Sequence, residues 1–194
     1  NVGSVAVAVD VIQPSDKPLT IGVLSHASYN YYGFDGLIDD VRVYNKALTE
    51  AELQTVIGEA DVDPGASTFG DDQTELFYQS FDDQQSIDDA GGTGSDYALV
   101  PGFVGNGIQL DSGASLTFDS VGKINRHSGE INFKFKPEWD GSALSATQYL
   151  FTARGRVSDN RTVDLRIFIY KGGDKSYFVL RFDNLFNCDP ANQI

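Results

Sequence analysis

One stretch of the chain decides the fold: Gly33-Phe34-Asp35-Gly36-Leu37-Ile38-Asp39-Asp40-Val41-Arg42-Val43-Tyr44-Asn45-Lys46-Ala47-Leu48-Thr49-Glu50-Ala51-Glu52-Leu53. Residues 37–44 are rich in β-branched and aromatic side chains, which predicts a buried strand. Thr49 stands three residues before Glu52, which is the spacing of a helix-capping box. The stretch therefore predicts a strand that leads directly into one short helix near residues 49–57, which Gly58 ends.

This stretch resembles the C-terminal signature of the laminin-G-like, concanavalin A-like jelly-roll family. In that family, a pattern of the form Gly-x-Ile-Asp-Glu-Val-Arg-Ile-Tyr-Asn-Arg-Ala-Leu-Ser-x-x-Glu-Ile makes the last strand and the final helical turn. The resemblance implies an all-β fold, an antiparallel jelly-roll β-sandwich of the concanavalin A-like type. The residues that match the pattern are Gly36, Ile38, Asp39, Val41, Arg42, Tyr44, Asn45, Ala47, Leu48, Glu52 and Leu53.

Later segments of the chain resemble the N-terminal half of the same family. Leu76-Phe77-Tyr78-Gln79-Ser80-Phe81-Asp82-Asp83 is similar to the opening strand, and residues 101–111 are similar to the glycine loop that feeds the next strand. The intervening segment is acidic and rich in turn residues. We therefore expect residues 1–57 to be the C-terminal part of one sandwich, residues 58–75 a linker, and residues 76–194 the N-terminal part of a second sandwich.

The middle strands of the family have no counterpart between these two parts, so three arrangements are open. The chain is a window from a longer tandem array, or it is permuted so that its own two parts pack together, or neighbouring chains complete each part. The third arrangement has a physical basis, because an incomplete sandwich exposes unpaired strand edges that recruit a matching edge. Identical chains joined head to tail in this way would form a filament.

Composition limits the possible functions. The formal net charge of −14 argues against nucleic acid and anionic lipid as partners. No apolar run approaches the length of about 18 residues that would indicate a membrane span, so we expect no membrane insertion. The single cysteine, Cys188, leaves no partner for an intrachain disulfide, and the absence of methionine indicates a piece of a longer, processed protein. Asn160-Arg161-Thr162 is an acceptor pattern for N-glycosylation at Asn160.

We expect no enzymatic activity. The family includes glucanases, in which a Glu-x-Asp-x-x-Glu run on one strand supplies the two catalytic carboxylates. The corresponding run here is Glu130-Ile131-Asn132-Phe133-Lys134-Phe135, in which only the first of the three acidic positions is acidic.

Four aspartates are candidate ligands of a structural calcium ion (Ca²⁺). The first and last strands of the family lie side by side, and this would bring Asp82 and Asp83 close to Asp39 and Asp40. Carboxylate oxygens are the ligands that calcium prefers. The alternative is that Asp39 caps a turn and Asp82 is merely exposed.

A cluster of aromatic side chains, Tyr29, Tyr31 and Tyr32 beside Asn30, provides a candidate glycan-binding site, and Trp139 provides another. Sugar binding requires aromatic faces next to polar groups that satisfy the sugar hydroxyls. The alternative is that these rings close the core at the rim of the sandwich.

The resemblance implies an extracellular or cell-surface, non-catalytic adhesion or glycan-binding repeat. The competing class is a structural subunit of a self-assembling extracellular filament or surface array. The partners of such a subunit would be copies of itself or neighbouring repeats, joined head to tail.

Overall fold

The computed structural model describes residues 12–13, 18–24, 33–58, 75–124, 129–139, 144, 146–157 and 162–185. This part of the chain contains ten strands and two short helices. Their order and bounds are β1 (Ile12–Gln13), β2 (Leu19–Ile21), β3 (Gly36–Tyr44), α1 (Glu50–Gly58), β4 (Glu75–Gln79), α2 (Gln84–Asp89), β5 (Thr93–Pro101), β6 (Asn106–Phe118), β7 (Glu130–Pro137), β8 (Gln148–Val157), β9 (Thr162–Gly172) and β10 (Lys175–Leu185). Neither helix is long and apolar enough to cross a membrane.

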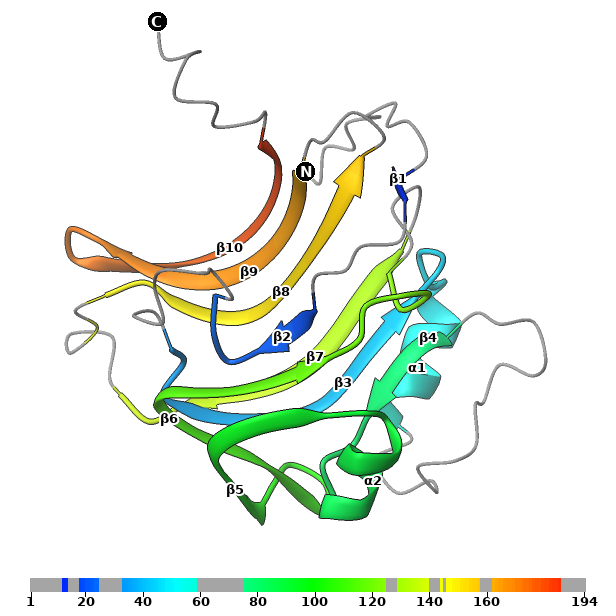
Figure 1. Ribbon diagram of the computed structural model, residues 1–194. Coiled ribbons are helices and arrows are strands. Elements are labelled where there is room, and N and C mark those ends of the chain that lie inside the picture. Colours follow the sequence, from blue (N-terminus) through cyan, green and yellow to red (C-terminus); the bar gives the residue numbers. More distant parts are fainter. Residues whose placement is uncertain are drawn as a thin grey trace, which may run out of the picture.

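The strands form one antiparallel sheet that curls over itself into two facing layers (Figure 1). Neighbouring strands follow the order β10-β9-β8-β2-β6-β3-β4, with β7 also paired to β3 and β5 to β6. We call the layer that contains β10, β9, β8 and β2 the first layer, and the layer that contains β3, β4 and β7 the second. Strand β6 belongs to both layers, because Phe118 near its end pairs with Leu19 of β2 while Leu110 pairs with Gly36 of β3. The predicted all-β, antiparallel jelly-roll fold is confirmed.

Strand β3 lies in the middle of the second layer, between β7 on one side and β6 and β4 on the other. Its register shifts between Asp39 and Arg42, where Asp40 has a left-handed φ of 52°. An extra residue in a strand reverses the facing of every residue after it. The bulge at Asp40 therefore leaves Ile38, Val41 and Val43 together in the hydrophobic core.

Both parts of the chain build this one sandwich. Strands β2 and β3 come from the first part, and they pair with β4, β6, β7 and β8 from the second. Leu19 and Ile21 are fully buried in the same core cluster as Phe118 and Phe151. This is the arrangement in which the chain's own two parts pack together. The origin of the parts in two consecutive repeats stays a prediction.

The predicted short helix near residues 49–57 is confirmed as α1. The capping box is formed, since the Thr49 amide donates to Glu52 Oε2 at 2.8 Å and the Glu52 amide donates to Thr49 Oγ1 at 3.3 Å. Lys46 Nζ donates to the other oxygen, Glu52 Oε1, at 2.8 Å. The Lys46 and Thr49 hydrogen bonds favour the charged carboxylate and lower the pKa of Glu52 to about 2.

Candidate functional site

The first candidate site lies where β3 meets the glycine loop, residues 102–105, which joins β5 to β6. Asp39 Oδ2 accepts hydrogen bonds from the amides of Phe103 at 2.7 Å and Val104 at 3.1 Å. Asp82 Oδ1 accepts a hydrogen bond from the Asn106 amide at 3.0 Å, and Asn106 Nδ2 donates to the Asp82 carbonyl at 2.7 Å. The two aspartates therefore hold the two ends of the same loop.

Glycines allow the loop to approach both carboxylates this closely. A Cβ atom at Gly102 would lie 2.6 Å from Asp39 Oδ2, and one at Gly105 would lie 1.9 Å from Asp82 Oδ1. The residue before Asp82, Phe81, is fully buried and has a φ of 63°. A bulky residue rarely adopts that conformation, and it persists only where the surrounding structure fixes it. Here the buried Phe81 ring anchors the turn that presents Asp82 to the loop.

Asp39 is a buried carboxylate, and only one of its two oxygens accepts hydrogen bonds from described residues. Its side chain is fully shielded from solvent, and burial raises its pKa, although the Val104 and Phe103 amides act in the opposite direction. Within the described structure, Asp39 Oδ1 has no hydrogen-bond partner. A buried oxygen without a partner is unusual in a folded protein, and it is the type of ligand atom that a hard cation accepts.

The other two predicted calcium ligands have different partners. Asp40 accepts a hydrogen bond from the Tyr78 hydroxyl at 3.2 Å and forms an ion pair with Lys134. Asp83 is the N-cap of α2, with its Oδ1 accepting from the Ser86 amide at 2.7 Å. Among the described residues, no three acidic, histidine or cysteine side chains gather around a common point. A calcium ion here would therefore depend on Asp39, Asp82 and backbone oxygens.

The second candidate site is a row of aromatic rings across β8, β9 and β10. The ring centroids of Tyr149 and Phe168 are 5.2 Å apart, and those of Phe168 and Tyr170 are 6.2 Å apart. Tyr170 and Tyr177 are stacked, with centroids 5.1 Å apart and an angle of 17° between the rings. Tyr149 and Phe168 are buried, whereas Tyr170 and Tyr177 are 37% and 41% exposed. The row therefore ends in an exposed, stacked pair of tyrosines.

The β9–β10 hairpin fixes this tyrosine pair. Its loop has two residues, Gly173 and Asp174, and the φ of 65° at Gly173 suits glycine at the first position of such a turn. The register places Tyr170 directly opposite Tyr177. The Tyr177 ring also lies close over Gly172, where a Cβ atom would be only 2.9 Å from it.

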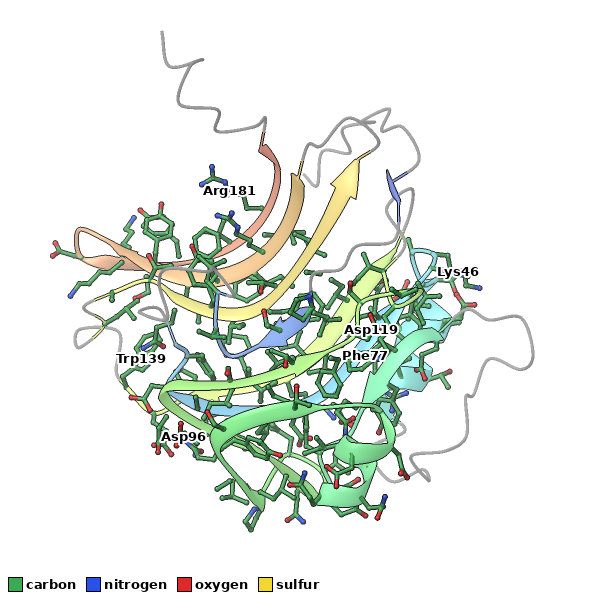
Figure 2. The ribbon with its side chains drawn as sticks, viewed as in Figure 1. Lys46, Phe77, Asp96, Asp119, Trp139 and Arg181 are labelled. Atoms are coloured by element: carbon green, nitrogen blue, oxygen red, sulfur yellow. The ribbon has the colours of Figure 1, made fainter. Side chains whose placement is uncertain are left out.

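The tyrosine pair lies on the outer face of the first layer. Arg181 is four residues beyond Tyr177 on the same strand and therefore projects from the same face. Figure 2 shows Arg181 on the side of β10 that faces away from β7. Register pairs Arg181 with Arg166 and Lys175 with Gly172, so cationic side chains flank the tyrosines at both ends.

The glycan-binding residues predicted from the sequence do not include this pair. Tyr29, Asn30, Tyr31 and Tyr32 lie outside the described residues, as does the glycosylation candidate Asn160. The ring of Trp139 is partly buried against the core, and its Nε1 donates to Gln148 Oε1 at 2.6 Å. Its role in sugar binding stays a prediction.

Comparison with protein families matches residues 1–54 to the concanavalin A-like lectin/glucanases superfamily. The resemblance inferred from the signature stretch is thereby confirmed for that part of the chain. No curated protein and no solved structure matches the chain. The family match and the fold together define a lectin/glucanase-like β-sandwich.

Proposed function

We propose that the protein is a non-catalytic glycan-binding repeat of the laminin-G-like type, which acts in adhesion outside the cell or at its surface. The observation that carries this proposal is the exposed, stacked pair Tyr170 and Tyr177. The apolar faces of sugar rings pack on aromatic rings, and a β-hairpin holds such rings in a fixed position. Arg166, Lys175 and Arg181 lie on the same face and carry donors for sugar hydroxyls.

The hydrogen bonds of the Glu130 carboxylate support the non-catalytic part of the proposal. This residue aligns with the first carboxylate of the hydrolase run. Its Oε2 accepts a hydrogen bond from the Leu48 amide at 2.9 Å, and its Oε1 accepts one from Asn132 Nδ2 at 3.3 Å. Asn132 stands where a hydrolase has its second acidic residue. Glu130 thus joins β7 to the segment before α1.

We expect Tyr170→Ala to weaken glycan binding by about tenfold or more. Covering a large apolar side chain contributes about 1.5–3 kcal/mol, and about 1.4 kcal/mol corresponds to a factor of ten in affinity. An array of neutral and acidic oligosaccharides would identify a binder, and calorimetric titration with that oligosaccharide would measure the change.

Two matched variants make this test specific. Tyr170→Phe keeps the ring and should bind nearly as well as the native protein. Phe103→Ala removes a ring that is 50% exposed on the glycine loop and should leave binding unchanged. Native-like binding by Tyr170→Ala, or an array without any binder, would count against the proposal.

The proposal includes a structural calcium ion bound at the glycine loop by Asp39 and Asp82. Its support is the buried Asp39 Oδ1 oxygen, which has no hydrogen-bond partner among the described residues, together with a second carboxylate, Asp82, at the end of the same loop. Such an ion would supply the positive charge that a buried carboxylate requires. It would also fix the loop without taking part in any reaction.

We expect calcium to stabilise the native protein and not the Asp39→Asn variant. At free calcium of 100 times the Kd, the gain would be about 2.7 kcal/mol, or roughly 5–10 °C in Tm for a chain of this size. Asp83→Asn is the matched control, because asparagine caps a helix as well as aspartate does. Thermal unfolding in calcium and in a chelator would measure the gain. An equal calcium response in native protein and Asp39→Asn would refute the assignment.

The same site predicts a pH dependence. Because the pKa of Asp39 is raised in the folded protein, the metal-free fold binds a proton more readily than the unfolded chain does. This contribution to stability is present at low pH and is lost as the pH rises from 3.8 through the raised pKa. Protons compete with calcium for the same carboxylate, so the calcium-dependent rise in Tm should shrink as the pH falls through that pKa.

A further inference from the structure

Strand β10 ends the sheet. Within the described strands it pairs with β9 alone, over its whole length from Lys175 to Leu185. Figure 1 shows it at the edge of the first layer, far from α2 and β5. A long edge of this kind presents a row of backbone donors and acceptors that another strand can pair with.

The edge strand also carries exposed apolar side chains on the face that belongs inside a sandwich. Phe178 and Leu180 are 56% and 58% exposed. They lie opposite Ile169 and Ile167, which are buried in the core. The Phe178 ring stacks on Phe135 of β7, with centroids 5.8 Å apart. The inner face of β10 is therefore an extension of the core that the described part of the chain leaves exposed.

We propose that β10 pairs antiparallel with β10 of a second copy, about a two-fold axis that passes through Val179. An axis perpendicular to the sheet keeps the inner faces of both copies on the same side. Val179 then faces Val179, and Phe178 faces Leu180 of the other copy. The two apolar residues that each copy exposes thus become neighbours, and each sheet continues into the next.

The charges along β10 favour this register over one centred on Phe178. With the axis at Val179, position 177 faces position 181 and position 175 faces position 183. The first of these pairs is a tyrosine with an arginine. An axis at Phe178 would instead place Lys175 opposite Arg181, and like charges directly opposite each other destabilise a strand pair.

The acidic character of the chain is compatible with this contact. The sequence has no lysine or arginine between Lys46 and Lys123, so the excess negative charge lies in the segments that carry α1, α2 and β4 to β6. The β9–β10 hairpin, residues 162–185, contains four basic residues and three aspartates, so its net charge is +1. Repulsion between distant charges is screened over about 8 Å at physiological salt.

The dimer would place the Tyr170–Tyr177 pairs of both copies on one side of a continuous sheet. Two sites on a rigid unit bind a repetitive polysaccharide more tightly than either site alone. The dimer does not depend on glycan binding, and each proposal can fail without the other.

Cysteine cross-linking tests the register directly. In a Cys188→Ser background, Val179→Cys should form a disulfide-linked dimer on mild oxidation, because residue 179 faces itself across the axis. Ser176→Cys is the matched control on the same strand, and it should not link because it faces residue 182. Equal linking by both variants, or no linking by Val179→Cys, would overturn the proposal.

Sedimentation equilibrium of the native chain gives a second readout. We expect a reversible dimer whose Kd rises at least tenfold in Leu180→Lys, a change at an exposed position that should leave the circular dichroism spectrum native. A native chain that remains monomeric at all concentrations would exclude the dimer. Open-ended assemblies would also overturn the dimer and would indicate the head-to-tail filament.

Discussion

Replacing Gly36 with alanine is expected to lower the free energy of unfolding by about 3–4 kcal/mol. Gly36 has a φ of 150°, and a Cβ atom there would lie 2.4 Å from the Lys136 carbonyl oxygen and 2.9 Å from Pro137 Cα. Both atoms belong to the backbone of β7, which pairs with β3 at this position. They can move away only if that pairing opens. Urea unfolding followed by the fluorescence of Trp139 would measure the loss.

The variant Gly113→Ala separates the cost of a positive φ from the cost of the close contact with β7. Gly113 also has a positive φ, 104°, but no atom of the described residues lies within 4 Å of a Cβ atom there. It should therefore show the backbone cost alone, about 1–2 kcal/mol. If Gly36→Ala is no more destabilising than Gly113→Ala, the close contact between β3 and β7 does not hold the two strands in register.

Gly36 also shows why the fold could be predicted from the sequence. The signature stretch contains a glycine for close backbone approach, apolar residues for a buried strand, and a capping box. All three features act locally and are visible in one segment. Helix α2 was not predicted, because it has six residues and buries only Ile87. A single apolar contact leaves no helical periodicity in the sequence.

The candidate sites were harder to predict, because they depend on the register of the strands and on which face of the sheet is covered. The resemblance brought Asp39 and Asp82 to one region, and in the structure both accept hydrogen bonds from backbone amides at the glycine loop. The bulge at Asp40 gives that residue other partners, Tyr78 and Lys134. Such a register shift leaves no mark in the alternation of residue types.

The tyrosine pair could have been found from its spacing, since Tyr170 and Tyr177 are equidistant from the Gly173-Asp174 turn. The exposure of the two tyrosine rings could not have been predicted from the sequence. Towards its C-terminal end, strand β9 is apolar on both faces, with Ile167 and Ile169 on one and Phe168 and Tyr170 on the other. The sequence pattern therefore does not reveal which face the second layer covers.

Glu75→Ala should be the other strongly destabilising substitution, costing about 2–4 kcal/mol. Arg42 is 7% exposed, and its Nη1 lies 3.6 Å from Glu75 Oε2. Its guanidinium also lies 4.1 Å from the centre of the Tyr78 ring and interacts electrostatically with the Tyr44 hydroxyl. Removing Glu75 leaves a buried cation whose remaining partners among the described residues are aromatic. Burial also raises the pKa of Tyr44 to about 12, so its hydroxyl stays neutral and supplies no counter-charge.

The double variant Arg42→Met/Glu75→Leu would show whether the pair itself stabilises the fold. Two apolar side chains of similar volume avoid the desolvation of both charges, so we expect this variant to unfold at nearly the native urea concentration. The partly exposed pair Lys46–Glu52 is the matched comparison, and Lys46→Ala should cost less than about 1 kcal/mol. If Glu75→Ala costs no more than Lys46→Ala, water must reach Arg42 when Glu75 is removed. The join between β3 and β4, and thus between the two parts of the chain, would then depend on the apolar core and not on the ion pair.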